Sequence, residues 1–170
     1  MQYARWGVDY LKEDWCNTTN INAKGAYQLM SDALRAAGRP IFHSMCEWGD
    51  NMPWKWAKNI GHSWRIGPDI WCSFDSLHVF PTFTQYSVMH CIAKNDTLRQ
   101  YAGKGHWNDP DMLEVGNGMT NNEDRTHFAM WCMMASPLII GNDIRNMSAE
   151  TKTILMNKEM IAVDQDTLGV

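Results

Sequence analysis

The sequence has no cluster of lysine and arginine and no long apolar run. Its 15 Lys and Arg residues face 19 Asp and Glu residues, which gives a formal net charge of −4. A nucleic-acid backbone or an anionic membrane surface would need a basic patch, and the chain offers none. The longest apolar stretch, residues 128–140, is interrupted by Ser136 and Pro137 and is too short to span a bilayer. We therefore expect neither a nucleic acid nor a membrane as partner.

Three further patterns are missing. The five cysteines are an odd number without C-x-x-C spacing, which fits neither a disulfide scaffold nor a zinc ribbon. A glycine-rich phosphate-binding turn is also absent. The first residues lack the apolar and small-residue regions of a secretion signal, so the protein is either cytoplasmic or preceded by sequence that this chain does not include.

What remains has the composition of one globular domain. The chain has 170 residues, of which 45% are hydrophobic and 20% charged. Nine of them are tryptophans, an unusually high number. Most are expected to pack in the core, but flat indole faces also suit sugar rings.

Apolar periodicity predicts alternating strands and helices. The pattern predicts strands at 8–12, 41–46, 62–65, 107–109 and 138–140. It predicts helices at 26–37, 54–60, from the capping box Thr120-x-x-Glu123 to Pro137, and from Ser148 to about 157. Such alternation implies parallel strands, in either a doubly wound sheet or a (β/α) barrel.

Carboxylates favour the barrel. An acidic residue follows each of the first four predicted strands: Asp14, Glu47, Asp69, and Asp109 with Asp111. In a barrel these strand ends share one rim, where catalysis takes place, whereas a doubly wound nucleotide binder would need the missing glycine-rich turn.

Carboxylates on one rim beside tryptophans suit glycoside hydrolysis. This reaction needs one acid at the anomeric carbon and another to protonate the departing oxygen. Lys12 and Asp14 leave the same side of a strand, so the ammonium favours the ionised carboxylate that a nucleophile requires. Asp69 follows the stiff Gly67-Pro68 pair, and burial near Trp64 or Trp71 would favour its protonated form.

Several motifs carry a family resemblance. With x for positions that do not carry the resemblance, they are WGVDYLKxDxC at 6–16, CEWG at 46–49, WRxxxD at 64–69, WNDPDMLEVG at 107–116, PLIIGNDIR at 137–145 and DQDxLGV at 164–170. In this order the chain resembles the α-galactosidases of glycoside hydrolase family 27 over almost its whole length.

The resemblance implies retaining hydrolysis of terminal α-D-galactosyl residues, through a covalent galactosyl-enzyme intermediate and without a metal or organic cofactor. The nucleophile of the family falls on Asp14 and its acid/base on Asp69, with the two carboxyls about 5 to 5.5 Å apart. The expected sugar-binding residues, including a free thiol at the site, are Lys12, Cys46, Glu47, Trp48, Arg65 and Asp111.

Other interpretations of the activity and of the site residues remain open. Glu13 and Trp15 flank Asp14 where relatives commonly carry other residues, and residues 70–101 match poorly, so α-N-acetylgalactosaminidase, β-L-arabinopyranosidase or isomaltodextranase activity is an alternative. Glu47 and Arg65 could instead form a structural ion pair. Asp-Pro-Asp at 109–111 also makes a good turn.

The resemblance further implies that the chain is part of a longer protein. It would hold about five of the eight units of a (β/α)8 TIM barrel in one partial catalytic domain, residues 1–170, without the N-terminal units and the C-terminal β domain. The full protein would be secreted or reside in a lysosome-like or vacuole-like compartment. Open barrel edges predict poor folding or self-association of this chain, and a noncatalytic carbohydrate-binding remnant is the second functional hypothesis.

Overall fold

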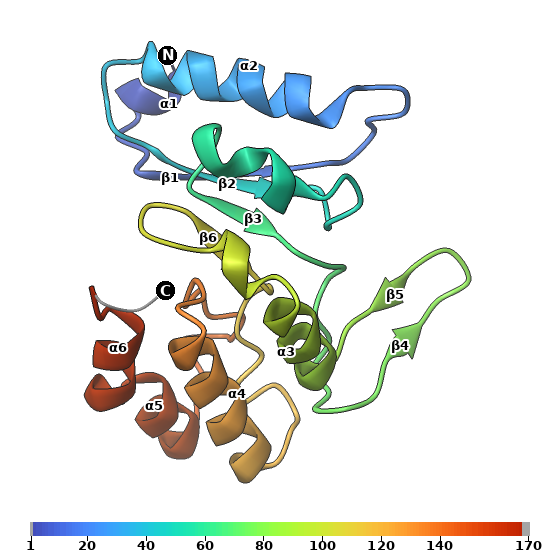
Figure 1. Cartoon of the computed structure of the whole chain (residues 1–170). Coiled ribbons are helices and arrows are strands. Elements are labelled where there is room, and N and C mark those ends of the chain that lie inside the picture. Colours follow the sequence, from blue (N-terminus) through green and yellow to red (C-terminus); the bar gives the residue numbers. More distant parts are fainter. Residues whose placement is uncertain (1, 168–170) are drawn as a thin grey trace.

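A four-stranded parallel sheet is the centre of the molecule (Figure 1). The structure is a computed structural model that describes residues 2–167, so the end of the DQDxLGV motif, Leu168 to Val170, lies outside the described residues. The strands follow chain order across the sheet: β1 (Tyr10–Asp14), β2 (Phe42–Cys46), β3 (Ser63–Arg65) and β6 (Trp107–Asp109). A parallel α/β sheet is therefore confirmed.

Helices and turns connect the strands or lie before and after them in the chain. The helices are α1 (Gln2–Arg5), α2 (Ala23–Arg35), α3 (Val88–Asp96), α4 (Asn121–Met133), α5 (Ala149–Leu155) and α6 (Lys158–Asp164). Short 3-10 helices are η1 (Pro53–Lys55), η2 (Ala57–Asn59) and η3 (Arg99–Tyr101), and β4 (His78–Val79) pairs with β5 (Thr84–Gln85) in a hairpin. Within residues 2–167, no helix is long and apolar enough to cross a membrane.

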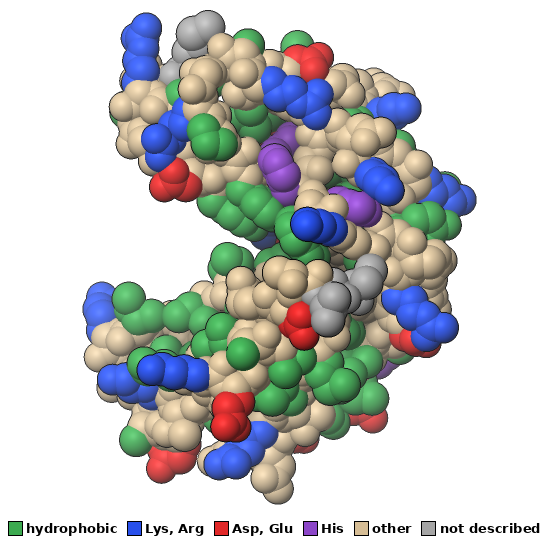
Figure 2. Space-filling view, turned by 60° about the vertical axis from the view of Figure 1, so that its left-hand side comes forward, with side chains coloured by type: hydrophobic (Ala, Val, Ile, Leu, Met, Phe, Trp, Pro, Cys, Tyr) green, Lys and Arg blue, Asp and Glu red, His purple; other side chains and the backbone are tan. Residues whose placement is uncertain are grey.

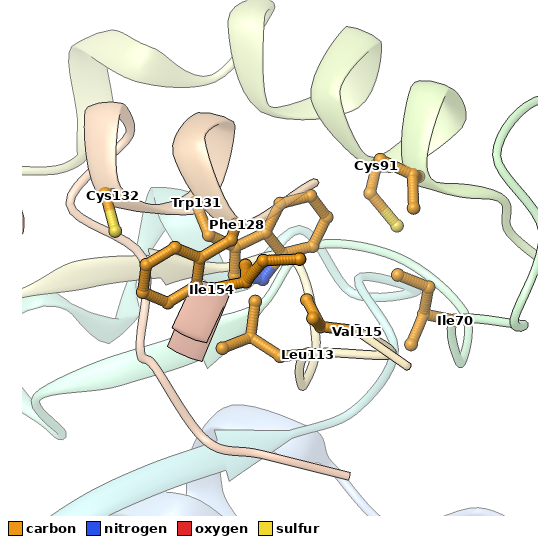
Figure 3. Packing of buried hydrophobic residues seen from close by; sticks show 9 residues of the cluster. Ile70, Cys91, Leu113, Val115, Phe128, Trp131, Cys132 and Ile154 are labelled. Atoms are coloured by element: carbon orange, nitrogen blue, oxygen red, sulfur yellow. The ribbon is translucent and has the colours of Figure 1, made fainter. Parts of the chain in front are cut away.

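Two hydrophobic cores hold these elements. The first packs α2 and the 3-10 turns against one face of the sheet, around Tyr27, Met45 and Trp64. The second lies among α3, α4 and α5, where Phe128, Trp131, Leu113, Val115 and Ile154 meet (Figure 3). Both cores contain fully buried indoles, Trp64 and Trp131, so these two tryptophans are core residues.

Local capping decides several helix boundaries. The predicted capping box of α4 is present, with Thr120 and Glu123 bonded to each other's backbone amides. The helix predicted from Ser148 to about 157 is in fact two helices. Asn157 divides them, because its side chain accepts hydrogen bonds from the amides of Glu159 and Met160 and so begins α6.

Other predictions need correction. The first strand is Tyr10–Asp14 rather than 8–12, since the carbonyls of Gly7 and Val8 bond to the Arg39 side chain instead of a strand. The helix predicted at 54–60 is the pair of short 3-10 turns η1 and η2. The strand predicted at 138–140 is reduced to one parallel bridge between Leu113 and Ile140.

Candidate active site

Strand register brings the predicted site to one face of the sheet. Pairing aligns Lys12 with Ser44, Asp14 with Cys46, and Arg65 with Asp109. Because side chains alternate along a strand, these residues share the face opposite the Tyr27 core. Their positions near the carboxyl ends of parallel strands put them at the same edge of the sheet.

Asp14 is the last residue of β1 and is exposed. Its Oδ1 accepts a hydrogen bond of 2.7 Å from the amide of Trp15. Lys12 lies two residues earlier on the same face, also exposed, as the sequence predicted. Both side chains are therefore free to meet a ligand at the sheet edge.

Glu47 follows β2 directly and is fully buried. Its Oε2 accepts bonds from the backbone amide of Asn51 at 2.6 Å and from the Asn51 side chain at 2.7 Å. Oε1 has no hydrogen-bond partner among the described residues. Burial raises the pKa of Glu47, although the two bonds from Asn51 oppose the shift. Glu47 is thus a fixed carboxyl group with one acceptor atom unused.

The turn after Glu47 needs left-handed backbone conformations. Trp48 has φ +56° and Gly49 has φ +81°. A methyl group on Gly49 would lie 2.6 Å from the carbonyl oxygen of Ile66, so the turn sits directly against the end of β3. This contact holds Trp48 beside the site.

Arg65 is the centre of the site. It is 1% exposed, and its Nη2 contacts Asp111 Oδ2 at 2.8 Å and Asp69 Oδ1 at 3.1 Å. Burial disfavours its charge, but Asp111 and Asp109 outweigh this effect, so the pKa of Arg65 is raised. The alternative of a Glu47–Arg65 ion pair is wrong, since the guanidinium pairs with aspartates and Glu47 with Asn51.

Asp109 and Asp111 are buried below the rim. Asp111 has φ +94°, and its carboxylate accepts bonds from the amides of Ile70 and Met112, each at 2.8 Å. Asp109 Oδ1 accepts from the amide of Asp111 at 2.9 Å, and burial raises the pKa of Asp109. The Asp-Pro-Asp sequence is therefore a turn, and it also supplies the counter-ion of Arg65.

Cys46 is a free, fully buried thiol. Its Sγ lies 3.6 Å from Nη1 of Arg65. Burial raises the pKa of Cys46 to about 12, which keeps it protonated at neutral pH. Among the described residues Cys46 has no disulfide partner, and a protonated thiol is a poor nucleophile.

Asp69 differs from the expectation. Its side chain is 58% exposed and touches Arg65, rather than being buried near Trp64 or Trp71. Trp64 points to the opposite side of β3 and bonds through its indole to Asn108 Oδ1 at 2.9 Å. The expected burial of Asp69 by these indoles is therefore wrong.

Asn51 was missed from the sequence. No motif singles it out, although it supplies both bonds to Glu47. The available signal was an amide side chain four residues after a buried carboxylate, across a glycine turn. Within residues 2–167, no three His, Cys, Asp or Glu side chains are placed to hold a metal ion.

The sheet face that carries the site borders a hollow. Figure 2 shows a deep notch at mid-height, between the part that contains α2 and the part that contains α4 to α6. One groove of about 640 Å³ is lined at the amino-terminal side of the strands by Tyr10, Phe42 and Trp107. The carboxylates described above lie at the other end of the strands.

Comparison with known proteins identifies the family. The model of the family described as "Alpha galactosidase A" matches residues 1–166. The chain belongs to the α-galactosidase family, glycoside hydrolase family 27. "Alpha-galactosidase A" of Cellvibrio japonicus is 55% identical over 170 residues, which are all of this chain and 42% of that protein.

Solved structures agree with this result. "Alpha-galactosidase I" from Mortierella vinacea superimposes with a TM-score of 0.92 at 41% identity, over 98% of this chain and 46% of that one. The α-galactosidase from Saccharomyces cerevisiae, solved with raffinose, gives a TM-score of 0.91 at 36% identity, over 99% of this chain and 41% of that one. The chain spans about two fifths of the length of the family members it matches.

Proposed function

We propose that this chain carries the catalytic centre of a retaining α-galactosidase that hydrolyses terminal α-D-galactosyl residues of oligosaccharides or glycoconjugates. The observation that carries the proposal is the family match over residues 1–166. The geometry supports it, because the residues expected at the site are gathered at one sheet edge. Raffinose, present in the yeast relative's structure, is a suitable substrate to test.

In the proposed reaction, Asp14 attacks the anomeric carbon while Asp69 gives a proton to the glycosidic oxygen. The leaving alcohol departs and a galactosyl ester on Asp14 remains. Asp69, now ionised, takes a proton from water, the water oxygen attacks the anomeric carbon, and the bond to Asp14 breaks. Galactose leaves with its original anomeric configuration.

The remaining residues hold the sugar in this proposal. The ammonium of Lys12 and the free Oε1 of Glu47 offer a donor and an acceptor to the hydroxyl groups. Trp48 closes one side of the sugar site, and the protonated thiol of Cys46 is an uncharged contact to the sugar. Asp111 fixes Arg65 through the 2.8 Å ion pair, so that the guanidinium presents a rigid edge to Asp69 and the ligand.

We also propose that the sheet is part of a (β/α)8 barrel whose other units lie outside this chain. The support is the coverage of only 42% of the Cellvibrio protein together with four parallel strands in chain order. An edge strand with unpaired backbone groups favours self-association of the isolated chain. For the full protein, a secreted or lysosome-like or vacuole-like location remains our proposal on the family resemblance.

The test is release of p-nitrophenol from p-nitrophenyl α-D-galactoside by the purified chain. Asp14→Asn should abolish turnover, while Asp32→Asn, an exposed carboxylate on α2, should leave it unchanged. The α-N-acetylgalactosaminide and the β-L-arabinopyranoside are assayed in parallel to decide among the family activities. No turnover by a chain shown to be folded would contradict activity of this chain and favour the noncatalytic alternative.

A further inference from the structure

An aromatic stack projects from the sheet edge beside Asp69. The rings of Trp71, His78, Phe80 and Phe83 follow one another with centroid separations of 4.4, 4.2 and 4.3 Å. These rings belong to the β4–β5 hairpin and the segment that leads into it, which stand off the body beyond the end of β3 (Figure 1). We call these four side chains the hairpin stack.

The hairpin stack is open to solvent. Trp71 is 38% exposed and Phe83 53%, and Val79 on the same hairpin is 69% exposed. A hairpin whose strands have two residues each is too small to form a core of its own. Its apolar side chains therefore stay in contact with water, which is unfavourable unless a ligand covers them. Exposed apolar patches of this kind mark binding surfaces.

The base of the hairpin is fixed to Asp69. The amide of Tyr86 donates to the carbonyl of Asp69 at 2.8 Å, and the amide of Trp71 donates to the carbonyl of Tyr86 at 2.7 Å. The Tyr86 ring packs on Gly67, where a methyl group would come within 3.1 Å of it. Through Tyr86, these backbone bonds fix the position of Trp71 relative to Asp69.

We propose that the hairpin stack binds the leaving sugar of an oligosaccharide α-galactoside. This inference rests on the proposed function, in which Asp69 protonates the glycosidic oxygen. The leaving sugar is attached to that oxygen, so it must extend past Asp69 on the side away from Asp14. The hairpin stack begins at that place.

The chemistry of the surface selects a neutral sugar. Between residues 66 and 93 the sequence contains two charged side chains, Asp69 and Asp75, and no lysine or arginine. The segment that carries the hairpin stack therefore offers no lysine or arginine to an anionic leaving group. A pyranose ring offers an apolar face of C–H groups that covers a flat aromatic ring, while its hydroxyls remain in water. Because the rings already support one another, little side-chain freedom is lost on binding.

A substrate pair separates the hairpin stack from the galactose site. Raffinose releases sucrose, whereas α-D-galactosyl fluoride releases only fluoride. Trp71→Ala and Phe83→Ala should each lower kcat/KM for raffinose roughly three- to tenfold, the effect of one lost ring contact. For α-D-galactosyl fluoride, kcat/KM of both variants should stay within about twofold of wild type, because the fluoride leaving group does not reach the hairpin. Trp6→Ala, which removes an indole that is 67% exposed near α1, should change neither substrate.

A binding measurement keeps the inference independent of turnover. Sucrose is titrated into the ¹⁵N-labelled chain, and the indole N–H signals of tryptophan are followed by NMR. The Trp71 signal, assigned by its loss in Trp71→Phe, should shift at sucrose concentrations of tens of millimolar, whereas the Trp6 signal should not move. Phe83→Ala should reduce the shift of the Trp71 signal.

The outcomes distinguish this inference from the proposed function. Hydrolysis of both substrates with unchanged selectivity in the variants overturns the inference and leaves the galactosidase intact. If neither substrate is hydrolysed, the sucrose titration decides, and an unmoved Trp71 signal overturns the inference. A sedimentation profile that Phe83→Ala converts from dimer to monomer would assign the surface to a second copy of the chain and also overturn it.

Discussion

Arg65 gives a direct test of how burial controls the strength of an ion pair. Its Nη2 contacts two carboxylates at similar distances, Asp111 at 2.8 Å and Asp69 at 3.1 Å. The Asp111 side chain is 6% exposed and that of Asp69 is 58% exposed. The same cation therefore meets one buried and one hydrated partner.

We expect Asp111→Asn to destabilise the chain by about 3–5 kcal/mol, because it leaves the buried guanidinium without its buried counter-ion. The NH2 group of the new amide also faces either Arg65 together with the backbone amide of Ile70, or the backbone amide of Met112, and all of these groups are donors. Asp69→Asn should cost at most about 1 kcal/mol, since water replaces the lost charge contact. Asp96→Asn, at an exposed pair with Arg99, is the control and should be close to neutral.

The measurement is urea unfolding followed by tryptophan fluorescence at fixed protein concentration. With a slope of about 2 kcal/mol/M, the expected loss for Asp111→Asn moves the midpoint down by about 2 M. A loss of the cooperative transition would agree with the expectation, because total stabilities are only about 5–15 kcal/mol. Equal midpoint shifts for Asp69→Asn and Asp111→Asn would refute the argument from burial.

Three further changes have defined outcomes. Gly49→Ala should lower the free energy of unfolding by more than about 2 kcal/mol, because its methyl group would lie 2.6 Å from the Ile66 oxygen at φ +81°. Gly7→Ala is the control: at φ +74° its methyl group meets no atom within 4 Å, so the loss should be about 1 kcal/mol. Thermal unfolding measures both. Burial lowers the pKa of His127 from 6.5 to about 3, so the unfolded chain binds the extra proton and stability should fall as pH drops from about 6.5 toward 3. The slope is at most about 1.4 kcal/mol per pH unit, and His127→Gln should reduce it in urea midpoints measured across that range. Thr120→Ala removes the capping box of α4 and should lower the free energy of urea unfolding by about 1 kcal/mol. An unchanged urea midpoint would contradict a role for the cap.

Much of the fold was accessible from the sequence because its signals were local. The four sheet strands were placed within about two residues, since apolar runs bounded by turns depend on near neighbours. The elements after Ile70 were not predicted, because the β4–β5 hairpin is held by contacts between aromatic rings and by backbone bonds to Asp69, which leave no periodic pattern in the sequence. The strand expected at 138–140 failed for the opposite reason. Its apolar run is present, but its pairing is limited to one bridge with Leu113, in which Ile139 and Gly141 make the backbone bonds.

The sequence predicts a set of site residues but not the contacts among them. Motifs located Asp14, Asp69 and Arg65 in the sequence, yet they do not show which groups pair across strands. Pairing depends on register, and the alignment of Arg65 with Asp109 appears only when β3 and β6 are adjacent. Burial of Asp69 was inferred from nearby indoles, and the prediction failed because Trp64 leaves β3 on the opposite face.

The strained conformation of Asp111 explains why these contacts form together. A non-glycine residue at φ +94° costs roughly 1–3 kcal/mol and persists only where its surroundings compensate. Here the compensation is visible: the carboxylate accepts two backbone amides and the charge of Arg65, and the Asp111 carbonyl accepts the indole N–H of Trp131 at 2.8 Å. The turn after β6 is thus fixed by α4 on one side and by the guanidinium on the other. A rigid Arg65 follows from this arrangement, and with it a defined position for Asp69 and for the hairpin that begins behind it.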